Sequence, residues 1–506
     1  MDQKRVVRGA SAAITSGLTA LLLSSSGTAL AQATTPPSVV DPNLAVRTVV
    51  EGLITPTSLA FIGPDEFLIL EKNTGKVQHV RGGRVVGTAL DLAVNSFSER
   101  GLLGIALHPD FPSNPGVYLY WTHAAANPQN EPESLTGVDT AVPAEVPLLG
   151  NRVDRFVWNG DTLTFDRNLI KLHAFQADAG QALRGNHNAG VLKFGPDRKL
   201  YAVIGDNGRR GWMQNLSCGP TAECPGPIVA DDQFGGPEPD NAHLTGVILR
   251  LNDDGSTPSD NPFFSVGAKM GGEVGANIQK VFAYGIRNTF GMAFDPVSGQ
   301  LWLQENGDDS FTQLRRVDAG LNSGWIQIRG PVSRIAEYKA IETTPPFVGL
   351  QQIRWPPSNI ADTPEEALSR LFMLPGAHFR DPEMSWKYEV APGGIGFHTG
   401  RALGPQYEND LFMGAAAPRL EGGHLFHFNL TGNRRKIGVD DPRLEDRVAD
   451  NTAKFDITES ESLLFGRNFG IGTHIQTGPN GNLFVVSLSN GAVYEIFRRK
   501  PMDRPD

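Results

Sequence analysis

The sequence predicts an all-β fold, and within that class a six-bladed β-propeller with long inserted loops. The first observation behind this is a repeated phrase: a short apolar strand, a turn rich in Pro, Asp and Gly, and a second apolar strand. Each copy is typical of a β-hairpin, and spaced copies are typical of radial repetition. The inner strands are predicted to start near Thr57, Arg100, Asn188, Asn288, Gly393 and His474.

Turn composition and repeat spacing are the second and third observations. The 506 residues include 57 glycines and 36 prolines, which favours many turns and few long helices. The copies lie further apart than the roughly 40–50 residues of a lean blade, so the excess is predicted to form loops that wall one face. A short helix is predicted within 362–371. The candidate loops are 123–150, 208–245, 254–280 and 329–385.

The first 32 residues are predicted to be a secretory signal peptide. Lys4, Arg5 and Arg8 precede an apolar stretch, and small residues at 29–31 offer a cleavage site. A membrane anchor is the alternative, but the apolar run is short and broken by serines. The mature chain is therefore expected to be periplasmic or secreted, without a membrane span.

The remainder divides into one large domain and two short ends. Residues 33–45 are rich in Pro, Thr and Ala and are predicted to form a flexible tail. The propeller is predicted over 46–498, where strand 46–50 closes the ring against the last strands. Residues 499–506 form a second tail.

Charge and cysteines limit the classes of partner. The formal net charge is −10 and no basic cluster is present, which argues against a nucleic-acid partner. Cys218 and Cys224 share one loop, where we expect a local disulfide; a redox or metal pair is the alternative.

Polar side chains recur at the ends of the predicted inner strands. Such residues are unexpected in a core, and their convergence in one concavity is the pattern of an active site. His187 could be a base or cap a turn, and Arg287 could bind an anion or pair with an acid. Asp308 and Asp309 could be solvated loop charges or Ca²⁺ ligands. The leading candidates are Glu99, His187, Asn188, Asp206, Arg287, Asn288, Asp308 and His474.

At these residues the chain resembles the soluble PQQ-dependent glucose/sorbosone dehydrogenases, also called aldose sugar dehydrogenases. The resemblance implies a six-bladed propeller that oxidises sugars with pyrroloquinoline quinone held by Ca²⁺, passing electrons to a further acceptor. It covers nearly the whole mature chain. The most specific stretches are 101–111, 188–208, 246–263, 285–302 and 322–325.

The resemblance also implies roles for single residues. His187 matches the base that takes a proton from the sugar hydroxyl, and Asp206 matches the acid that supports it. Arg287 and Asn288 match residues beside the quinone, and Arg287 would polarise its carbonyl. Gly307 matches a backbone-carbonyl ligand of Ca²⁺, followed by Asp308. The further cofactor-binding positions are Glu99, Asn188, Arg419 and His474.

Several positions depart from the family pattern. Glu99 stands in place of Gln, Ile286 in place of His, and Asp308 in place of Pro. An Arg that the family places near His474 has no counterpart there, although PQQ is a tricarboxylate. Two alternatives therefore stay open: a Ca²⁺-dependent hydrolase or lactonase on the same propeller, and a non-catalytic carbohydrate-binding propeller.

Overall fold

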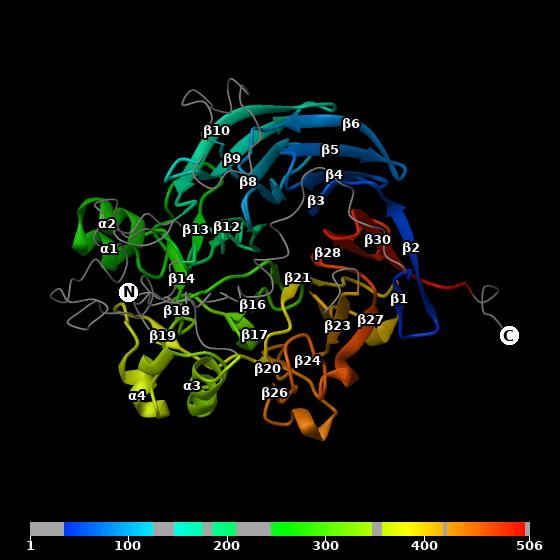
Figure 1. The fold of residues 1–506 in the computed structure, drawn as a ribbon. Coiled ribbons are helices and arrows are strands. Elements are labelled where there is room, and N and C mark those ends of the chain that lie inside the picture. Colours follow the sequence, from blue (N-terminus) through cyan, green and yellow to red (C-terminus); the bar gives the residue numbers. More distant parts are fainter. Residues whose placement is uncertain are drawn as a thin grey trace, which may run out of the picture.

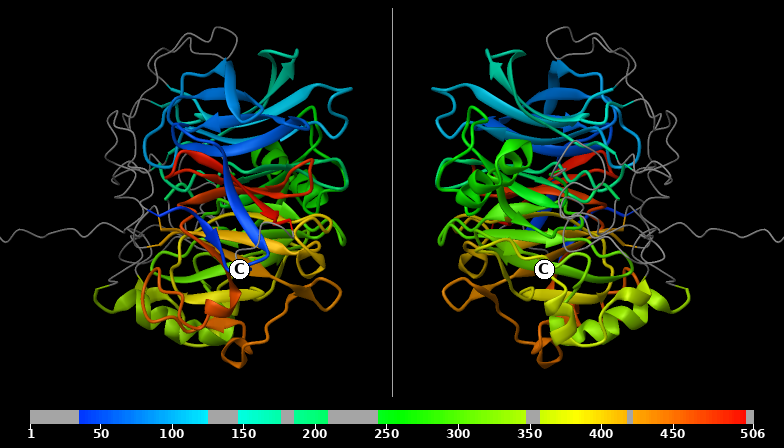
Figure 2. Two further views of the ribbon diagram at one scale, coloured as in Figure 1. Left: turned by 90° about the vertical axis from the view of Figure 1, so that its right-hand side faces the viewer. Right: turned by 90° about the vertical axis from the view of Figure 1, so that its left-hand side faces the viewer.

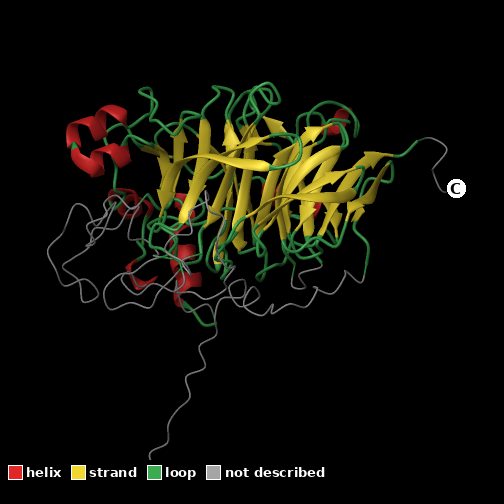
Figure 3. Cartoon of the chain, turned by 90° about the horizontal axis from the view of Figure 1, so that it is seen from above, coloured by secondary structure: helices red, strands yellow, loops and turns green. Residues whose placement is uncertain are grey.

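The structure is a computed structural model that describes residues 35–124, 146–175, 185–208, 244–346, 357–417 and 422–500. Strands dominate it, and they are grouped into sheets arranged around a centre (Figures 1 and 3). The predicted all-β propeller is confirmed. Within the described residues, no helix is long and apolar enough to cross a membrane.

Each large sheet is built on four antiparallel strands. In five sheets these strands run outward in chain order, and the sixth combines strands from both chain ends. From the inner strand outward, the first three sheets are β3 (Pro56–Gly63), β4 (Glu66–Glu71), β5 (Lys76–Arg81), β6 (Arg84–Asp91); β7 (Leu102–Leu107), β8 (Gly116–Thr122), β9 (Asn151–Trp158), β10 (Leu163–Leu172); and β11 (Leu192–Phe194), β12 (Leu200–Ile204), β13 (Val247–Leu251), β14 (Val281–Tyr284).

The next three sheets continue the order around the ring (Figure 1). They are β15 (Met292–Phe294), β16 (Leu301–Glu305), β17 (Ser310–Val317), β20 (Met384–Tyr388); β21 (Pro392–Phe397), β22 (Leu411–Ala415), β23 (His424–Phe428), β27 (Leu464–Arg467); and β28 (Gly472–Thr477), β29 (Leu483–Ser487), β30 (Ala492–Arg498), β2 (Leu44–Val50).

Short strands extend three of the sheets at their outer edge. β18 (Leu321–Asn322) and β19 (His378–Phe379) extend the β14 side in parallel, β26 (Val448–Ala449) pairs with β20, and β1 (Ser38–Val39) pairs with β27. Five of the large sheets thus have four or five strands, the size of a regular blade, whereas the β11–β14 sheet has six. The predicted count of six blades is therefore not shown, because five sheets have the size of a regular blade.

The inner strands contact one another in a closed series: β3, β7, β11, β15, β21, β28 and β3 again. All six start within a few residues of the predicted positions. Their first residues therefore gather around one axis, and this places the polar strand ends near one another.

The chain ends meet in one sheet. β2 pairs antiparallel with β30, so Leu44 lies opposite Arg498, and Figure 2 shows the blue N-terminal strand beside the red C-terminal strands. The predicted closing contact is present. Both β1 and the start of β2 fall within residues 33–45, the segment predicted to be a flexible tail. Their backbones are paired with β27 and β30.

The helices lie in the long insertions between strands (Figure 3). Thr363 begins α4, since its side chain accepts the backbone N–H of Glu366, and Pro364 takes the first helical position. The predicted short helix is therefore present. The helices and remaining strands are α1 (Phe264–Met270), α2 (Gly272–Ile278), α3 (Ile335–Thr343), α4 (Pro364–Ser369), η2 (Val332–Arg334), η3 (Pro357–Asn359), η4 (Pro405–Tyr407), η5 (Pro442–Leu444), η6 (Glu461–Leu463), β24 (Leu430–Thr431) and β25 (Lys436–Ile437).

Candidate active site

Glu99 joins two of the predicted site residues at the ring axis. Its Oε2 accepts the backbone N–H of His187 at 2.7 Å and the Nδ2 of Asn288 at 3.0 Å. The three residues precede β7, β11 and β15, which are consecutive inner strands. The predicted convergence of these strand starts is therefore observed for this trio.

His187 and Asp206 form a buried hydrogen-bonded pair. Nδ1 of His187 lies 2.5 Å from Oδ1 of Asp206. Burial alone would raise the pKa of Asp206, but the charge of His187 and its hydrogen bond, followed by the charge of Arg287, outweigh burial and lower it. The ionised carboxylate can only accept, so Nδ1–H of His187 donates to it. Among the described residues, Nε2 has no hydrogen-bond partner.

Two further donors hold the carboxylate of Asp206. Trp325 Nε1 donates to Oδ2 at 2.8 Å, and the backbone N–H of Gly208 donates to Oδ1 at 2.8 Å. Gly205 allows this packing, because a Cβ there would lie 2.5 Å from the carbonyl oxygen of His187. Trp325 was noted only as part of a matching stretch, and its indole N–H contact across the sheets has no local signal.

Arg287 is a buried cation anchored by acids and an aromatic ring. Its Nη2 donates to Oδ1 of Asp308 at 2.6 Å, and its guanidinium lies 5.5 Å from the ring centroid of Trp325. Burial lowers the pKa of Arg287, but the carboxylates of Asp308 and Asp206 outweigh it and raise the pKa. Arg287 therefore stays charged. Its Nε is buried and has no hydrogen-bond partner among the described residues.

Glu305 binds the backbone of Arg287. It accepts the backbone N–H of Arg287 at 3.0 Å, while its own charge is met by Arg329 Nη1 at 2.5 Å and the hydroxyl of Ser323 at 2.7 Å. The side chain of Arg287 thus pairs with Asp308, whereas Glu305 contacts its backbone. Arg329 was not foreseen, because nothing near it in the sequence indicates a buried ion pair.

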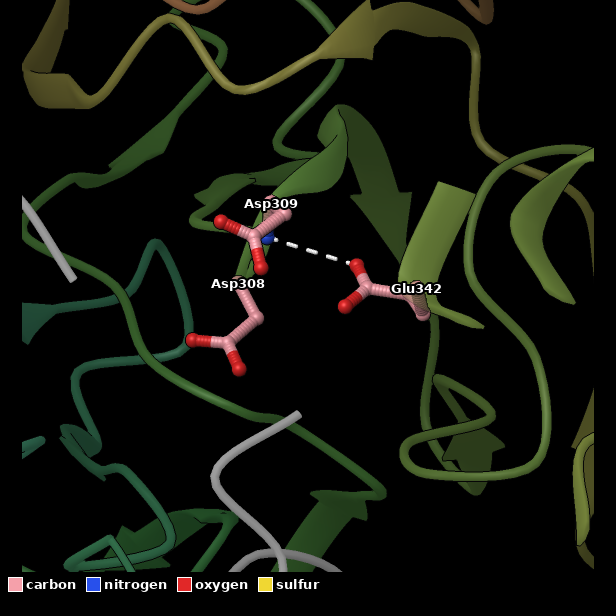
Figure 4. A group of neighbouring side chains, drawn as sticks. All are labelled: Asp308, Asp309 and Glu342. Carbon is pink, nitrogen blue, oxygen red and sulfur yellow. Dashed lines mark hydrogen bonds between the residues drawn. The ribbon is translucent and has the colours of Figure 1, made fainter. Parts of the chain in front are cut away.

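Asp308, Asp309 and Glu342 form an acidic cluster (Figure 4), and Asp308 pairs with Arg287. Their carboxylate oxygens lie within 4.8 Å of one another. Glu342 comes from α3 and is fully buried; its Oε1 accepts the hydroxyl of Ser310 at 2.7 Å, whereas Oε2 has no partner among the described residues. Burial, followed by the charges of Asp308 and Asp309, raises the pKa of Glu342 to about 8. A cation would relieve this repulsion.

Lys454 neutralises part of the negative charge of that cluster. Lys454 Nζ pairs with Asp309 Oδ1 and donates to the backbone carbonyl of Asp308 at 3.2 Å. Burial and then the charge of Asp308 raise the pKa of Asp309, even though Lys454 lowers it. The three acids are therefore only partly compensated by Lys454 and Arg287.

Gly307 is fixed by close packing of its backbone. Its N–H donates to Oε2 of Glu389 at 2.5 Å, and a Cβ would lie 2.0 Å from the carbonyl oxygen of Ser310. Only glycine fits this position. The backbone next to the acidic cluster is held in place as a result.

A cavity of about 170 Å³ occupies the ring axis next to this site. All six inner strands contribute to its wall, and Glu99 belongs both to the wall and to the trio described above. Its titratable side chains are Glu99, Lys72, Lys193 and His474, and most of the remaining wall is apolar. Neither lysine was predicted, since each stands within an ordinary strand phrase.

The other predicted residues fall in different places. His474 lies in the cavity wall, but Asn188 is fully buried, with its side chain bonded to Asn151 at 2.8 Å and to the carbonyl of Gly185 at 2.7 Å. Arg419, together with Cys218 and Cys224, lies outside the described residues.

Comparisons with known proteins agree on one family. The family model for Glucose / Sorbosone dehydrogenase matches residues 53–361. Quinoprotein glucose dehydrogenase B of Acinetobacter calcoaceticus is 28% identical over 293 residues, which cover 57% of this chain and 53% of that protein. Aldose sugar dehydrogenase YliI of Escherichia coli is 24% identical over 448 residues, which cover 88% and 90%.

A solved structure shares the fold. The PQQ-bound form of an aldose sugar dehydrogenase from Streptomyces coelicolor has a TM-score of 0.53 and 20% sequence identity, and the match covers 91% of this chain and 99% of that chain. At this identity the likeness establishes the fold alone.

Proposed function

Since this chain belongs to the glucose/sorbosone dehydrogenase family and is thus an oxidoreductase of that family, we propose that it oxidises a sugar or related alcohol by hydride transfer to PQQ, with His187 as general base. The observation that carries the proposal is the His187–Asp206 pair, in which Nδ1 donates to the carboxylate and Nε2 has no hydrogen-bond partner among the described residues. General bases of this kind contribute roughly 10²–10⁴-fold to a rate.

In this mechanism His187 takes the proton of the substrate hydroxyl on Nε2. The imidazolium that forms is stabilised by the ionised carboxylate of Asp206, which Trp325 and Gly208 hold in place. Asp206 also fixes the ring orientation, so the lone pair does not rotate away from the substrate.

Arg287 and Asn288 are the residues that would hold the quinone. Arg287 brings a fixed positive charge, because Asp308 and the ring of Trp325 position it before substrate arrives. Asn288 is oriented by Glu99, which also holds the backbone of His187. The carboxylate of Glu99 therefore fixes the position of Asn288 relative to His187.

The residues present fit both expected cofactors. For Ca²⁺ the chain offers oxygen ligands at Asp308, Asp309 and Glu342, including the unpartnered Oε2, beside the backbone of Gly307. For PQQ it offers Arg287 with its unpartnered Nε, together with the lysines of the adjoining cavity. When bound, PQQ would supply a carbonyl group that can accept hydride, and Ca²⁺ would act as a Lewis acid.

We count the six-stranded sheet as the sixth blade of the same propeller. Its strands β11–β14 repeat the four-strand pattern of the others, and β11 contacts the inner strands on both sides. The additional parallel strands are edge extensions that lie beyond the four-strand unit.

Export of the enzyme to the periplasm or medium belongs to the same proposal, and the basic, apolar and small-residue pattern of residues 1–32 supports it. The substrate would be a small sugar or alcohol, and a separate electron acceptor would reoxidise the cofactor.

Titration of the purified protein with PQQ and Ca²⁺, followed by dye reduction with a panel of aldoses, tests the proposal. We expect PQQ binding that depends on Ca²⁺ and turnover that depends on sugar. Absence of PQQ binding would reject it. In that case Ca²⁺-dependent ester hydrolysis is the next assay, because the acidic cluster also suits a hydrolase.

A further inference from the structure

Lys193 occupies an unusual position in the axial cavity. It projects from β11, and its Nζ lies 3.1 Å from Nε2 of His474 on β28. Among the described residues this is its only polar contact, and no carboxylate pairs with it. Lys72, the other lysine in the wall, instead donates to Asn73 Oδ1 and to the carbonyl of Ser96, both at 3.0 Å.

The hydrogen bonds of His474 determine which of its nitrogens carries the proton. The backbone N–H of Leu59 donates to Nδ1 at 2.9 Å, and the hydroxyl of Ser58 reaches the same atom at 3.2 Å. A backbone N–H can only donate, so Nδ1 holds a lone pair and the proton of the neutral ring sits on Nε2. Nε2–H therefore points at Lys193.

This arrangement requires an uncharged amine. An ammonium group has three donors and no lone pair, so it cannot accept the Nε2–H of His474. The contact at 3.1 Å thus describes Lys193 as a neutral amine that accepts a hydrogen bond. Burial lowers the pKa of Lys193 to about 8, so the neutral amine of this geometry is the main form above about pH 8. Burial, followed by the charge of Lys193 when it is protonated, holds the pKa of His474 well below its ordinary value.

We propose that Lys193 is a carboxylate-binding residue of the axial cavity, which at alkaline pH is uncharged in the free protein and takes up a proton when a carboxylate ligand enters. This rests on the proposed function, in which the ligand is the tricarboxylate PQQ. Beyond Lys72 and Lys193 the cavity wall contains no other cationic side chain among the described residues, and its remaining titratable groups are Glu99 and His474. Protonated Lys193 has three hydrogen-bond donors for a carboxylate, whereas the apolar part of the wall has none.

The inference predicts a proton-linked affinity with a defined sign. Above about pH 8, free Lys193 is uncharged and binding must take up a proton; well below pH 7, Lys193 is already charged and this uptake vanishes. A charge-assisted hydrogen bond contributes about 1.5–3 kcal/mol, so loss of Lys193 should weaken binding roughly 10–100-fold.

Calorimetric titration with PQQ and Ca²⁺ at pH 9, in two buffers of different ionisation enthalpy, tests the inference. Lys193→Met should take up about one proton fewer than wild type and bind roughly 10–100-fold more weakly. Lys199→Met is the matched control, since Lys199 lies in the turn between β11 and β12 and contacts Asn252 outside the cavity; it should match wild type. Lys193→Met with wild-type affinity and proton uptake would overturn the inference and leave the proposed function standing.

If wild type binds no PQQ, the proposed function fails and a second probe decides the inference. The same titration is then made with citrate, a smaller tricarboxylate. Citrate binding with proton uptake that Lys193→Met abolishes would support the lysine site, whereas absence of citrate binding would overturn it.

Discussion

The chemistry of the site depends on which atoms carry protons. Asp206 is ionised because His187, Arg287 and the N–H of Gly208 together outweigh its burial. It therefore holds the Nδ1–H of His187 in a hydrogen bond and fixes the orientation of the ring. Glu99 stands where the family has Gln. Its carboxylate accepts hydrogen bonds from both His187 and Asn288.

Asp206→Asn should separate orientation from charge. The amide is nearly the same size, but it lacks the negative charge that stabilises the imidazolium, and its NH₂ group faces donors. We expect kcat to fall roughly 10²–10⁴-fold while PQQ affinity changes little. Thermal unfolding should show that the variant is folded. A kcat within a factor of about two of wild type would remove Asp206 from the mechanism.

Asp206 should also contribute to acid sensitivity. Its folded-state pKa lies below the ordinary value of 3.8, so its stabilisation is present above that pH and is lost as the pH falls through the folded value. Urea unfolding from pH 6 down to pH 3 measures this. Asp206→Asn should lose less stability than wild type over that range, and equal losses would contradict the assignment.

At the scale of elements, α3 and the turn between β16 and β17 meet through their acids. Glu342 of α3 has a pKa of about 8 because it is buried next to Asp308 and Asp309. A carboxyl group with a raised folded pKa stabilises the fold below its unfolded pKa, and that stability is lost as the pH rises through about 8. Ca²⁺ would offset the loss by neutralising the cluster.

Melting temperatures at pH 6 and pH 8.5, each with and without Ca²⁺, check this prediction. Wild type should lose stability at the higher pH and regain it with Ca²⁺, whereas Glu342→Gln should show a smaller effect of both pH and Ca²⁺. The conservative variant keeps the contact with Ser310 possible. Equal responses of the two proteins would refute a cation role for the cluster.

Closure of the ring by β2 is a second element-scale feature. Leu44 is 1% exposed and packs with the hydrophobic residues of the last two blades. Leu44→Ala should cost about 2–5 kcal/mol, because it leaves a cavity at the seam. Val86→Ala on the exposed face of β6 is the control and should change stability by less than about 0.5 kcal/mol. Denaturant unfolding distinguishes the two, and equal midpoints would argue against a stabilising seam.

For the whole molecule, the repeat phrase was sufficient to locate the inner strands, because a hairpin is a local pattern. The same pattern placed His187, Asp206, Arg287 and Asn288 at strand ends, and all four lie at the ring axis. The parallel edge strands β18 and β19 were not foreseen, since two-residue strands have no periodicity to detect.

The missed residues share a different cause. Glu342, Trp325 and Lys193 act through contacts with residues far away in the chain, and their own sequence neighbourhoods look like an ordinary helix, loop and strand. Only the packing of the blades brings them to the axis. Sequence reasoning could therefore find His187 and Asp206, but not the groups that surround them.

The most direct test of the base is a single-turnover experiment on protein loaded with PQQ and Ca²⁺. Wild type and His187→Gln are mixed with an aldose, and reduction of the quinone is followed by its absorbance. His427→Gln is the control, because His427 pairs with Asp410 on an outer part of its blade. We predict that His187→Gln binds PQQ normally but reduces it at least about 100-fold more slowly than either wild type or the control. Reduction at the wild-type rate would contradict the account.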